Sequence, residues 1–383
     1  MTTLYKKTNR LKLSLAAVLL SAGLSACALT QINQTQSAPS KTLNLVEKLT
    51  DNPAKQIKES DLSAYLLVYF KDETHSAYFA ISEDGYTFTD VNNGEPVLLG
   101  SEVAEQQGVR DPHIYRGPDN AFYMTLTDLH IRAKNQGLRE TEWERPGEIY
   151  GWGNNKNLIM MKSHNLTDWT VARVPVAKLF PQVGDLGSAW APQTIYDEQA
   201  DKMMVYFSTR QQNKTNFMVY SYTNKDFTTL TTQPKQIFYH PNPDVNTIDA
   251  DITKIGDQYH MFYVAHDDRG NIRQAVSDKI NTDYRYDPTK VDSEEVAAEA
   301  PNLWRRHGTD TYVLMYDVFG AKPRNNMGFA ETTDFKTFKN IGRFNEPDSP
   351  MKATNFVGPK HGAVIAISKQ ELKRLHAYFN TQQ

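Results

Sequence analysis

Hydrophobic and polar positions alternate in short runs from about residue 62 to residue 376. The runs are rich in aromatic and β-branched residues, and Asp, Asn, Gly and Pro separate them. Alternation of this kind is typical of half-buried strands, whereas almost no segment has the spacing of an amphipathic helix. The pattern therefore predicts an all-β domain over residues 62–376.

Three short phrases recur along this domain. The first is a hairpin that turns through Asp, Asn or Gly, and it occurs five times. A second phrase precedes those hairpins, and its aligned apolar residues are Ile114, Ile195, Ile252, Leu303 and Val364. A third phrase lies between the other two in four copies. Its fifth copy, "YLLVYFKD" at 65–72, stands at the opposite end of the domain.

The displaced fifth copy predicts how the domain closes. A ring of blades that mixes N-terminal and C-terminal strands in one sheet requires such an offset, because the first and last segments then pair their edges. We expect a five-bladed β-propeller. Four blades begin near Asp111, Trp190, Asp249 and Glu299, and the fifth combines an innermost strand at 361–369 with outer strands at 63–92. The alternative is a β-sandwich whose hairpins are alike by coincidence.

Three acidic residues, Asp111, Asp249 and Glu299, stand at the start of the second phrase in three of the repeats. The innermost strands of a propeller surround a central channel, so these carboxylates are expected to converge on one small space. Crowded, buried carboxylates repel one another, which raises one pKa until that group donates a proton while another stays an ionised base. For Asp111 taken alone, Asp-Pro turn chemistry is the competing interpretation.

Four motifs carry a family resemblance: "RDPHI" from Arg110, "WAPQ" from Trp190, "IDADI" from Ile248 and "EAP" from Glu299. In this order and at this spacing, they resemble glycoside hydrolase family 43, the five-bladed arabinofuranosidases, arabinanases and xylosidases. The similarity runs from about Ser63 to Leu375. It departs from the family at Ala300, where a glycine is common.

The resemblance implies roles for the motif residues. Asp111 would be the general base, Glu299 the general acid and Asp249 the residue that tunes and orients the acid, with Asp251 as the alternative for that last role. Trp190 would line the pocket. The implied activity is an inverting, exo-acting glycosidase that releases α-L-arabinofuranose or a similar sugar from a plant or algal polysaccharide. Alternatives are a β-xylosidase, galactofuranosidase or anhydrogalactosidase of the same fold, or a non-catalytic glycan-binding surface lipoprotein.

Other residues near the motifs are candidates for binding. Arg110 would bind a substrate hydroxyl or neutralise Asp111, and His113 would line the channel. His361 would help to hold a structural calcium or, alternatively, fill the channel as a hydrogen-bonded histidine without metal. No cofactor is expected to be essential.

An insertion at 129–157 makes the first repeat the longest. Long insertions on a rigid scaffold often build binding surface. Its Trp143 and Trp152 would stack on sugar or, alternatively, pack the loop onto the propeller.

The N-terminus has a different character. Basic residues and an apolar run precede the tetrad ending at Cys27, which resembles a bacterial lipobox. We therefore expect a signal peptide over 1–26, lipidation of Cys27, a flexible tether over 27–61 without packed structure before Leu62, and an outer-membrane lipoprotein. An ordinary secretory signal is the alternative.

Composition narrows the choice of partners. Cys27 is the only cysteine, which excludes an intramolecular disulfide and a cysteine zinc site. Residues 1–26 contain four basic and no acidic side chains, so the mature chain has 38 basic against 45 acidic residues. That balance disfavours nucleic acid as a partner, and a monomer acting on saccharides is expected.

Overall fold

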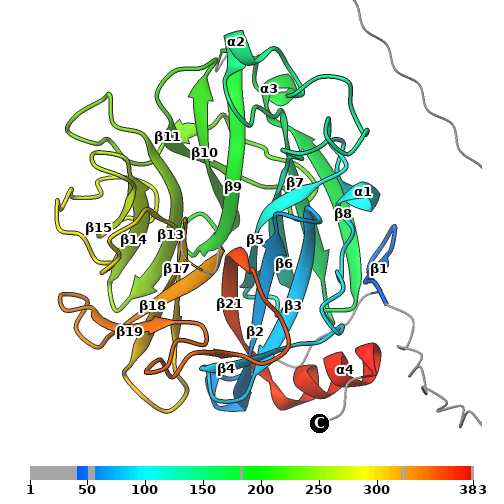
Figure 1. The fold of residues 1–383 in the computed structure, drawn as a ribbon, viewed down its shortest axis with the longest axis vertical. Coiled ribbons are helices and arrows are strands. Elements are labelled where there is room, and N and C mark those ends of the chain that lie inside the picture. Colours follow the sequence, from blue (N-terminus) through cyan, green and yellow to red (C-terminus); the bar gives the residue numbers. More distant parts are fainter. Residues whose placement is uncertain (1–40, 51–56, 182–183, 321, 323–324, 381–383) are drawn as a thin grey trace, which may run out of the picture. The chain divides into compact units, whose positions relative to one another are not determined.

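Five β-sheets surround a common centre in the computed structural model, which describes residues 41–50, 57–181, 184–320, 322 and 325–380 (Figure 1). Each sheet is one blade of a propeller, so the predicted all-β, five-bladed fold is confirmed and the sandwich alternative is wrong. The signal segment and Cys27 lie outside the described residues.

The strands of each blade are given from the centre outward. Blade 1 contains β5 (Val109–Arg116), β6 (Phe122–Asp128), β7 (Asn157–Ser163), β8 (Asp168–Pro175) and β1 (Asn44–Leu45). Blade 2 contains β9 (Leu186–Asp197), β10 (Lys202–Gln211), β11 (Phe217–Tyr222) and β12 (Lys235–Gln236). Blade 3 contains β13 (Thr247–Ile255), β14 (Gln258–Ala265) and β15 (Asn271–Ser277).

Blade 4 contains β16 (Ala298–Arg305), β17 (Tyr312–Val318), β18 (Asn326–Thr332) and β19 (Lys339–Arg343). Blade 5 contains β21 (Lys360–Ser368), β2 (Leu62–Lys71), β3 (Ser76–Ser82), β4 (Thr87–Asp90) and β20 (Lys352–Ala353). The innermost strand β21 comes from the C-terminal part of the chain and pairs antiparallel with β2, so that Leu67 lies opposite Val364. The predicted closure by N- and C-terminal strands is confirmed.

Apolar side chains fill each of the five interfaces between neighbouring blades. One cluster joins blades 5 and 1, and four others join blades 1 and 2, 2 and 3, 3 and 4, and 4 and 5. Because both faces of a blade meet a neighbour, the second strands are buried along almost their whole length, as in β6 and β14. The core is therefore a ring around the channel.

One segment before Leu62 is packed, contrary to the expectation for the tether. Leu43 is buried in the cluster between blades 5 and 1, and its N–H donates to Val97 O at 2.8 Å. Asn44–Leu45 form β1, a parallel edge strand beside β8. Burial of Leu43 between the two blades thus stabilises this segment, although the residues around it are mostly polar.

Helices are few and short: η1 (Glu59–Asp61), α1 (Gly100–Val103), α2 (Gly147–Tyr150), α3 (Val176–Leu179) and α4 (Lys369–Phe379). Ser368 and Glu371 form a capping box that begins α4. Helix α4 packs Leu372, Leu375 and Phe379 against blades 5 and 1, so packed structure continues past the expected end at residue 376. Among the helices of the described residues, none has the length and apolarity to cross a membrane.

Candidate active site

Every innermost strand has an irregularity near its beginning. In each one, two residues stand opposite a single residue of the second strand, as in a β-bulge. The first residue of each pair has a positive φ: Asp111 (51°), Ala191 (44°), Asp249 (55°), Ala300 (57°) and His361 (22°). Left-handed backbone is costly for residues other than glycine, and such strain tends to gather at functional sites.

The bulges turn consecutive side chains toward one cavity, although consecutive residues of a regular strand face opposite sides. Arg110 and Asp111, Ile248 and Asp249, and Lys360 and His361 all line this cavity. Glu299 stands one position before its bulge, whereas Asp111 and Asp249 stand at theirs. The three acids therefore come from two neighbouring positions of the repeat.

The cavity has a volume of about 380 Å³ and lies where the innermost strands begin. It contains all three predicted catalytic acids together with Arg110, Trp152, Trp190 and His361. The remaining lining residues are Phe70, Asp72, Leu129, Ile131, Ile248, Phe319 and Lys360. Two predicted site residues, His113 and Trp143, do not line it.

His361 forms the closest charged contact of Asp111. Its Nδ1 lies 3.3 Å from Asp111 Oδ1 and 3.9 Å from Asp249 Oδ2. Burial by itself would raise the pKa of Asp111, but His361, Arg110 and a hydrogen bond from Thr127 hold it well below its usual range. Burial opposes the charge on His361, yet the nearby carboxylates raise the pKa of this imidazole. Asp111 is thus suited to act as an ionised base.

Asp249 is in a different electrostatic state. Burial, together with the negative charges of Glu299 and Asp111, raises its pKa to about 7, although His361 partly offsets these effects. An Asp249 carboxyl that holds a proton near neutrality differs sharply from Asp111 in the same pocket. Such separation of pKa values is characteristic of acid–base sites.

Asp251 lies two residues after Asp249 on β13 and does not line the cavity. Its Oδ1 accepts a hydrogen bond from Asn302 Nδ2 at 3.1 Å, and its Oδ2 accepts one from Leu303 N at 3.0 Å. Burial raises its pKa to about 7. Both of its oxygens bond to blade 4, so its contacts join blades and do not reach Glu299.

The same position in other blades forms similar links. His113 Nδ1 accepts a hydrogen bond from Thr194 N at 3.3 Å, and Asn302 Oδ1 accepts one from Val364 N at 2.8 Å. Burial, and to a lesser extent the charge of His361, lowers the pKa of His113 to about 3, which agrees with a neutral, accepting ring. The described hydrogen bond of His113 is thus with the neighbouring blade, and the lining of the channel by His113 stays a prediction.

Two ion pairs, which the sequence motifs did not reveal, involve the cationic residues of the cavity lining. Arg110 Nη1 lies 2.8 Å from Asp72 Oδ1, and Lys360 Nζ lies 3.1 Å from Asp317 Oδ2. Burial opposes the charge on Lys360, but Asp317 raises the pKa of this ammonium overall. Asp72 and Asp317 both lie near the end of a copy of the third phrase. This shared position is the sequence signal that could have identified them. Arg110 therefore has a carboxylate partner in addition to Asp111.

Three tryptophans form one wall and its rim. Trp152, whose side chain is 55% exposed, makes edge contacts with Trp190 at 5.9 Å and with Trp143 at 5.5 Å between ring centroids. Trp190 lies in the cavity, Trp152 lies at its edge, and Trp143 supports Trp152 from outside the cavity. Trp143 thus packs against Trp152, and Trp152 is exposed at the cavity, whereas stacking of either ring on sugar stays a prediction.

The insertion is fixed to blade 2 by polar contacts. Trp190 Nε1 donates to Gly153 O at 2.8 Å, and Arg210 Nη2 donates to Trp152 O at 2.6 Å. The guanidinium of Arg210 also stacks on Trp190, 4.4 Å from the ring centroid. A Cβ atom on Gly153, which has φ +65°, would lie 3.2 Å from the Trp190 ring. Trp152 is therefore held in a defined position.

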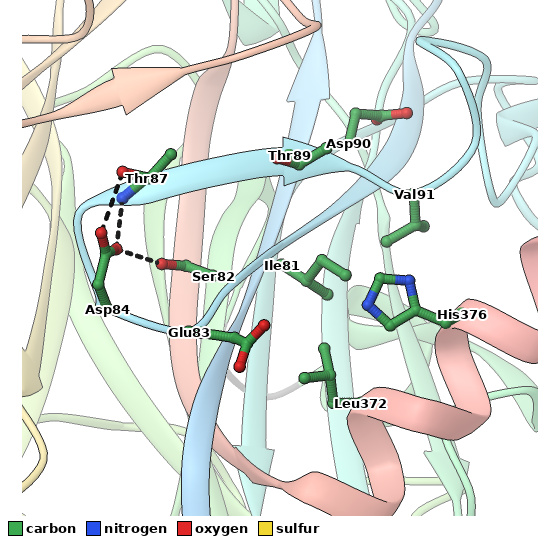
Figure 2. A pocket seen from close by; sticks show the side chains of 10 residues that line it. All are labelled: Ile81, Ser82, Glu83, Asp84, Thr87, Thr89, Asp90, Val91, Leu372 and His376. Carbon is green, nitrogen blue, oxygen red and sulfur yellow. Dashed lines mark hydrogen bonds between the residues drawn. The ribbon is translucent and has the colours of Figure 1, made fainter. Parts of the chain in front are cut away.

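A second hollow, between the β3–β4 hairpin and α4, has different chemistry (Figure 2). Asp84 receives hydrogen bonds from Tyr86, Thr87 and Ser82 within its own turn. Asp90 likewise accepts bonds from Tyr69, Asn92 and Gly94. Because these carboxylates serve the local turns, the site for acid–base chemistry is the cavity at the channel.

A structural calcium in the channel, held with the help of His361, is one of the expectations from the sequence. The described residues contain no group of three or more His, Cys, Asp or Glu side chains placed to hold a metal ion. His361 faces Asp111 and Asp249, and both oxygens of Asp251 already accept hydrogen bonds. The calcium expectation stays a prediction, and no step below depends on a metal.

Solved structures of glycosidases are among those that resemble this one. An endo-1,4-β-xylanase from Bacteroides thetaiotaomicron is 10% identical, and the match covers 73% of this chain and 91% of that chain with a TM-score of 0.51. The catalytic domain of the family 62 α-L-arabinofuranosidase from Coprinopsis cinerea is 14% identical, with 66% of this chain and 73% of that chain covered and a TM-score of 0.46.

The sequence comparisons give the family. An α-L-arabinofuranosidase from Bifidobacterium longum subsp. longum is 24% identical over an alignment of 242 positions, and the match covers 56% of this chain and 21% of that protein. The match thus spans about a fifth of the relative. Residues 60–373 match a family related to glycoside hydrolase family 43 and described as "Probable glycosyl hydrolase domain". The chain belongs to this family of glycosyl hydrolase domains, as its motifs predicted.

Proposed function

We propose that the protein is an inverting, exo-acting glycosidase that releases terminal α-L-arabinofuranose from a plant or algal polysaccharide. The observation that carries this proposal is the gathering of Asp111, Asp249 and Glu299 in one cavity at three bulged strands. Keeping these acids together is electrostatically unfavourable, which favours a catalytic explanation over a structural one.

The proposed reaction gives Asp111 and Glu299 one proton transfer each. Asp111, ionised, removes a proton from a water molecule as the water oxygen attacks the anomeric carbon. Glu299 gives its proton to the glycosidic oxygen while the bond between the anomeric carbon and that oxygen breaks. The products are a sugar with inverted configuration and a free hydroxyl on the leaving group. Two carboxyl groups roughly 6.5–9.5 Å apart leave room for the water.

Asp249 is proposed to tune and orient Glu299. The charge interaction between these two residues supports this role, because it means that the two carboxyl groups are close enough to affect each other. Asp251 is the weaker candidate because its oxygens bond to Asn302 and Leu303 of blade 4. His361 supplies positive charge beside Asp111, which favours the ionised form of the base.

The size and walls of the cavity support exo action on a small sugar. Its volume of about 380 Å³ is near the lower end of the roughly 300–1,000 Å³ typical of small-molecule sites. Trp190 and Phe70 offer aromatic surface, while Arg110 and Lys360 offer hydrogen-bond donors. Trp152, at the rim of the cavity, would contact the leaving-group part of the substrate.

The arabinofuranose preference is supported by the name of the Bifidobacterium relative. A panel of nitrophenyl glycosides tests it against β-xylosides and galactofuranosides, and agar oligosaccharides test anhydrogalactosidase activity. We expect release from the α-L-arabinofuranoside, a monosaccharide product from arabinan, and inversion in the proton NMR spectrum of the first product. Glycan binding without release of sugar after long incubation would instead support the non-catalytic lipoprotein.

We further propose that Cys27 is lipidated and that the protein is a monomeric outer-membrane lipoprotein. The lipobox-like tetrad supports this location. Fractionation of cells that express the wild type or Cys27→Ser is the test. The substituted protein should leave the membrane fraction, and its retention there would contradict lipidation.

A further inference from the structure

Thr127 makes two hydrogen bonds that join the base to the neighbouring blade. It lies on β6 opposite Arg110, is fully buried and does not line the cavity. The N–H of Ala191 donates to Thr127 Oγ1 at 2.8 Å, and Thr127 Oγ1 donates to Asp111 Oδ2 at 2.7 Å.

The available protons determine which atom donates and which accepts in each of these two hydrogen bonds. A backbone N–H can only donate, so it occupies a lone pair of the Thr127 hydroxyl. The hydroxyl has one proton, and the carboxylate of Asp111 is its acceptor. The buried oxygen of the base thus receives a donated hydrogen bond, while its Oδ1 faces His361.

Blade 2 contains an equivalent hydroxyl, but this hydroxyl does not bind a carboxylate. Ser208 lies opposite Trp190, as Thr127 lies opposite Arg110, and its Oγ accepts a hydrogen bond from Asp249 N at 2.9 Å. The residue at the bulge of blade 2 is Ala191, which has no side-chain acceptor. In blades 1 and 2 a hydroxyl at this position therefore joins neighbouring blades, and of these two only the hydroxyl of blade 1 also holds an acid.

We propose that Thr127 is the positioning residue of the general base, which fixes the rotation of the Asp111 carboxylate and leaves Oδ1 for the attacking water. The inference rests on the proposed function, because it concerns the same site. Thr127 acts through Asp111 and does not contact the sugar. The orientation matters because proton transfer requires the accepting oxygen within hydrogen-bond reach of the water.

The test is Thr127→Val, which replaces the hydroxyl by a methyl group of similar size. We expect kcat to fall by about 10- to 100-fold, the range for loss of a hydrogen bond to a charged group, with a smaller change in KM. The acidic limb of the pH profile should move to higher pH, because an acceptor without its donor is protonated more readily. Thr127→Ser should restore most of the activity.

Other charges around Asp111 would remain in place. His361 on β21, Arg110 on β5 and Asp249 on β13 face it, Glu299 on β16 shares the cavity, and His75 lies within electrostatic range. None of these groups changes in Thr127→Val. A carbon-13 NMR titration of the Asp111 carboxyl therefore measures the effect of the hydroxyl without relying on turnover.

Thr125→Val is the matched control. Thr125 lies on the same strand, is equally buried and donates to Pro192 O of blade 2, but it does not contact a carboxylate. Equal losses in the Thr125 and Thr127 variants with an unchanged pH profile, or a Thr127→Ser variant as slow as Thr127→Val, would overturn the inference. If Thr127→Val keeps wild-type activity while Asp111→Asn is inactive, the inference about Thr127 is wrong but the proposed function stands. If Asp111→Asn is active, the proposed function is wrong.

Discussion

The imidazole of His361 contacts the carboxylate of Asp111 across the closure of the ring, with Nδ1 3.3 Å from Oδ1. The two residues are at the bulges of β21 and β5, the innermost strands of the last and first blades. The same Nδ1 lies 3.9 Å from Asp249 Oδ2. His361 thus stands beside two of the three acids. Closure of the propeller by β21 is what brings its positive charge to the carboxylates.

Removal of either proton-transfer group should nearly abolish turnover. We expect Asp111→Asn and Glu299→Gln each to lower kcat by at least about 10²–10⁴-fold, with circular dichroism spectra like that of the wild type. Glu83→Gln is the control, because Glu83 lines the separate hollow beside α4. Wild-type turnover in either pocket variant would contradict the assignment.

His361→Gln should move the acidic limb of the activity profile to higher pH, because Asp111 loses the cation that lowers its pKa. The contact also affects stability. The raised pKa of His361 adds stability below its usual value of 6.5, and this stability is lost as pH rises through the folded-state pKa. The lowered pKa of Asp111 adds stability above 3.8, which is lost as pH falls through its folded-state pKa.

The difference in unfolding free energy between the wild type and His361→Gln should therefore be largest between pH 3.8 and 6.5. Urea titrations at pH 3, 5 and 8 measure it. A difference that is the same at all three values would show that the histidine acts by packing alone.

Asp249→Asn and Asp251→Asn should have different effects on turnover. Since burial and neighbouring charges raise the pKa of Asp249 to about 7, the folded state holds this proton from pH 3.8 to 7 and loses stability as pH rises through that range. Asparagine removes that loss, so Asp249→Asn should be inactive yet gain stability relative to the wild type between pH 5 and 8.

Asp251→Asn removes a similar pH-dependent loss, because the pKa of Asp251 is also raised to about 7. It also costs about 1–3 kcal/mol of stability, because an amide nitrogen would face the donors of Leu303 or Asn302. It should keep substantial turnover. Paired denaturation and rate measurements on both variants decide which aspartate tunes the acid. An inactive, fully stable Asp251→Asn would assign the role to Asp251.

Trp152→Ala should raise KM by about 2- to 10-fold, the range for loss of an aromatic contact, with little change in kcat or melting temperature. The ring is more than half exposed at the rim of the cavity, so little packing is lost. Trp143→Ala should have a weaker effect of the same kind, because Trp143 only supports Trp152. Tyr239→Ala, an exposed aromatic beside another hollow, should leave KM for small aryl glycosides unchanged.

Spacing and chemistry along the chain were enough to predict the ring. The three phrases repeat because each blade needs the same strands, and the copy at 65–72 is displaced because β2 pairs with β21. Asp111, Asp249 and Glu299 could be selected because they recur at the start of equivalent strands. Leu43 was missed since one apolar residue in a polar segment gives no periodic signal.

The tertiary structure alone decided how the acids differ. Positive φ angles at the bulges turn neighbouring side chains into one cavity, and local sequence pattern does not indicate such strained backbone. The partners of the site residues, among them Asp72, Thr127, Asp317 and Arg210, lie on other strands or other blades. A pKa depends on burial and on charges that are close in space, so Asp111 and Asp249, alike in the sequence, acquire different protonation states only when the ring closes.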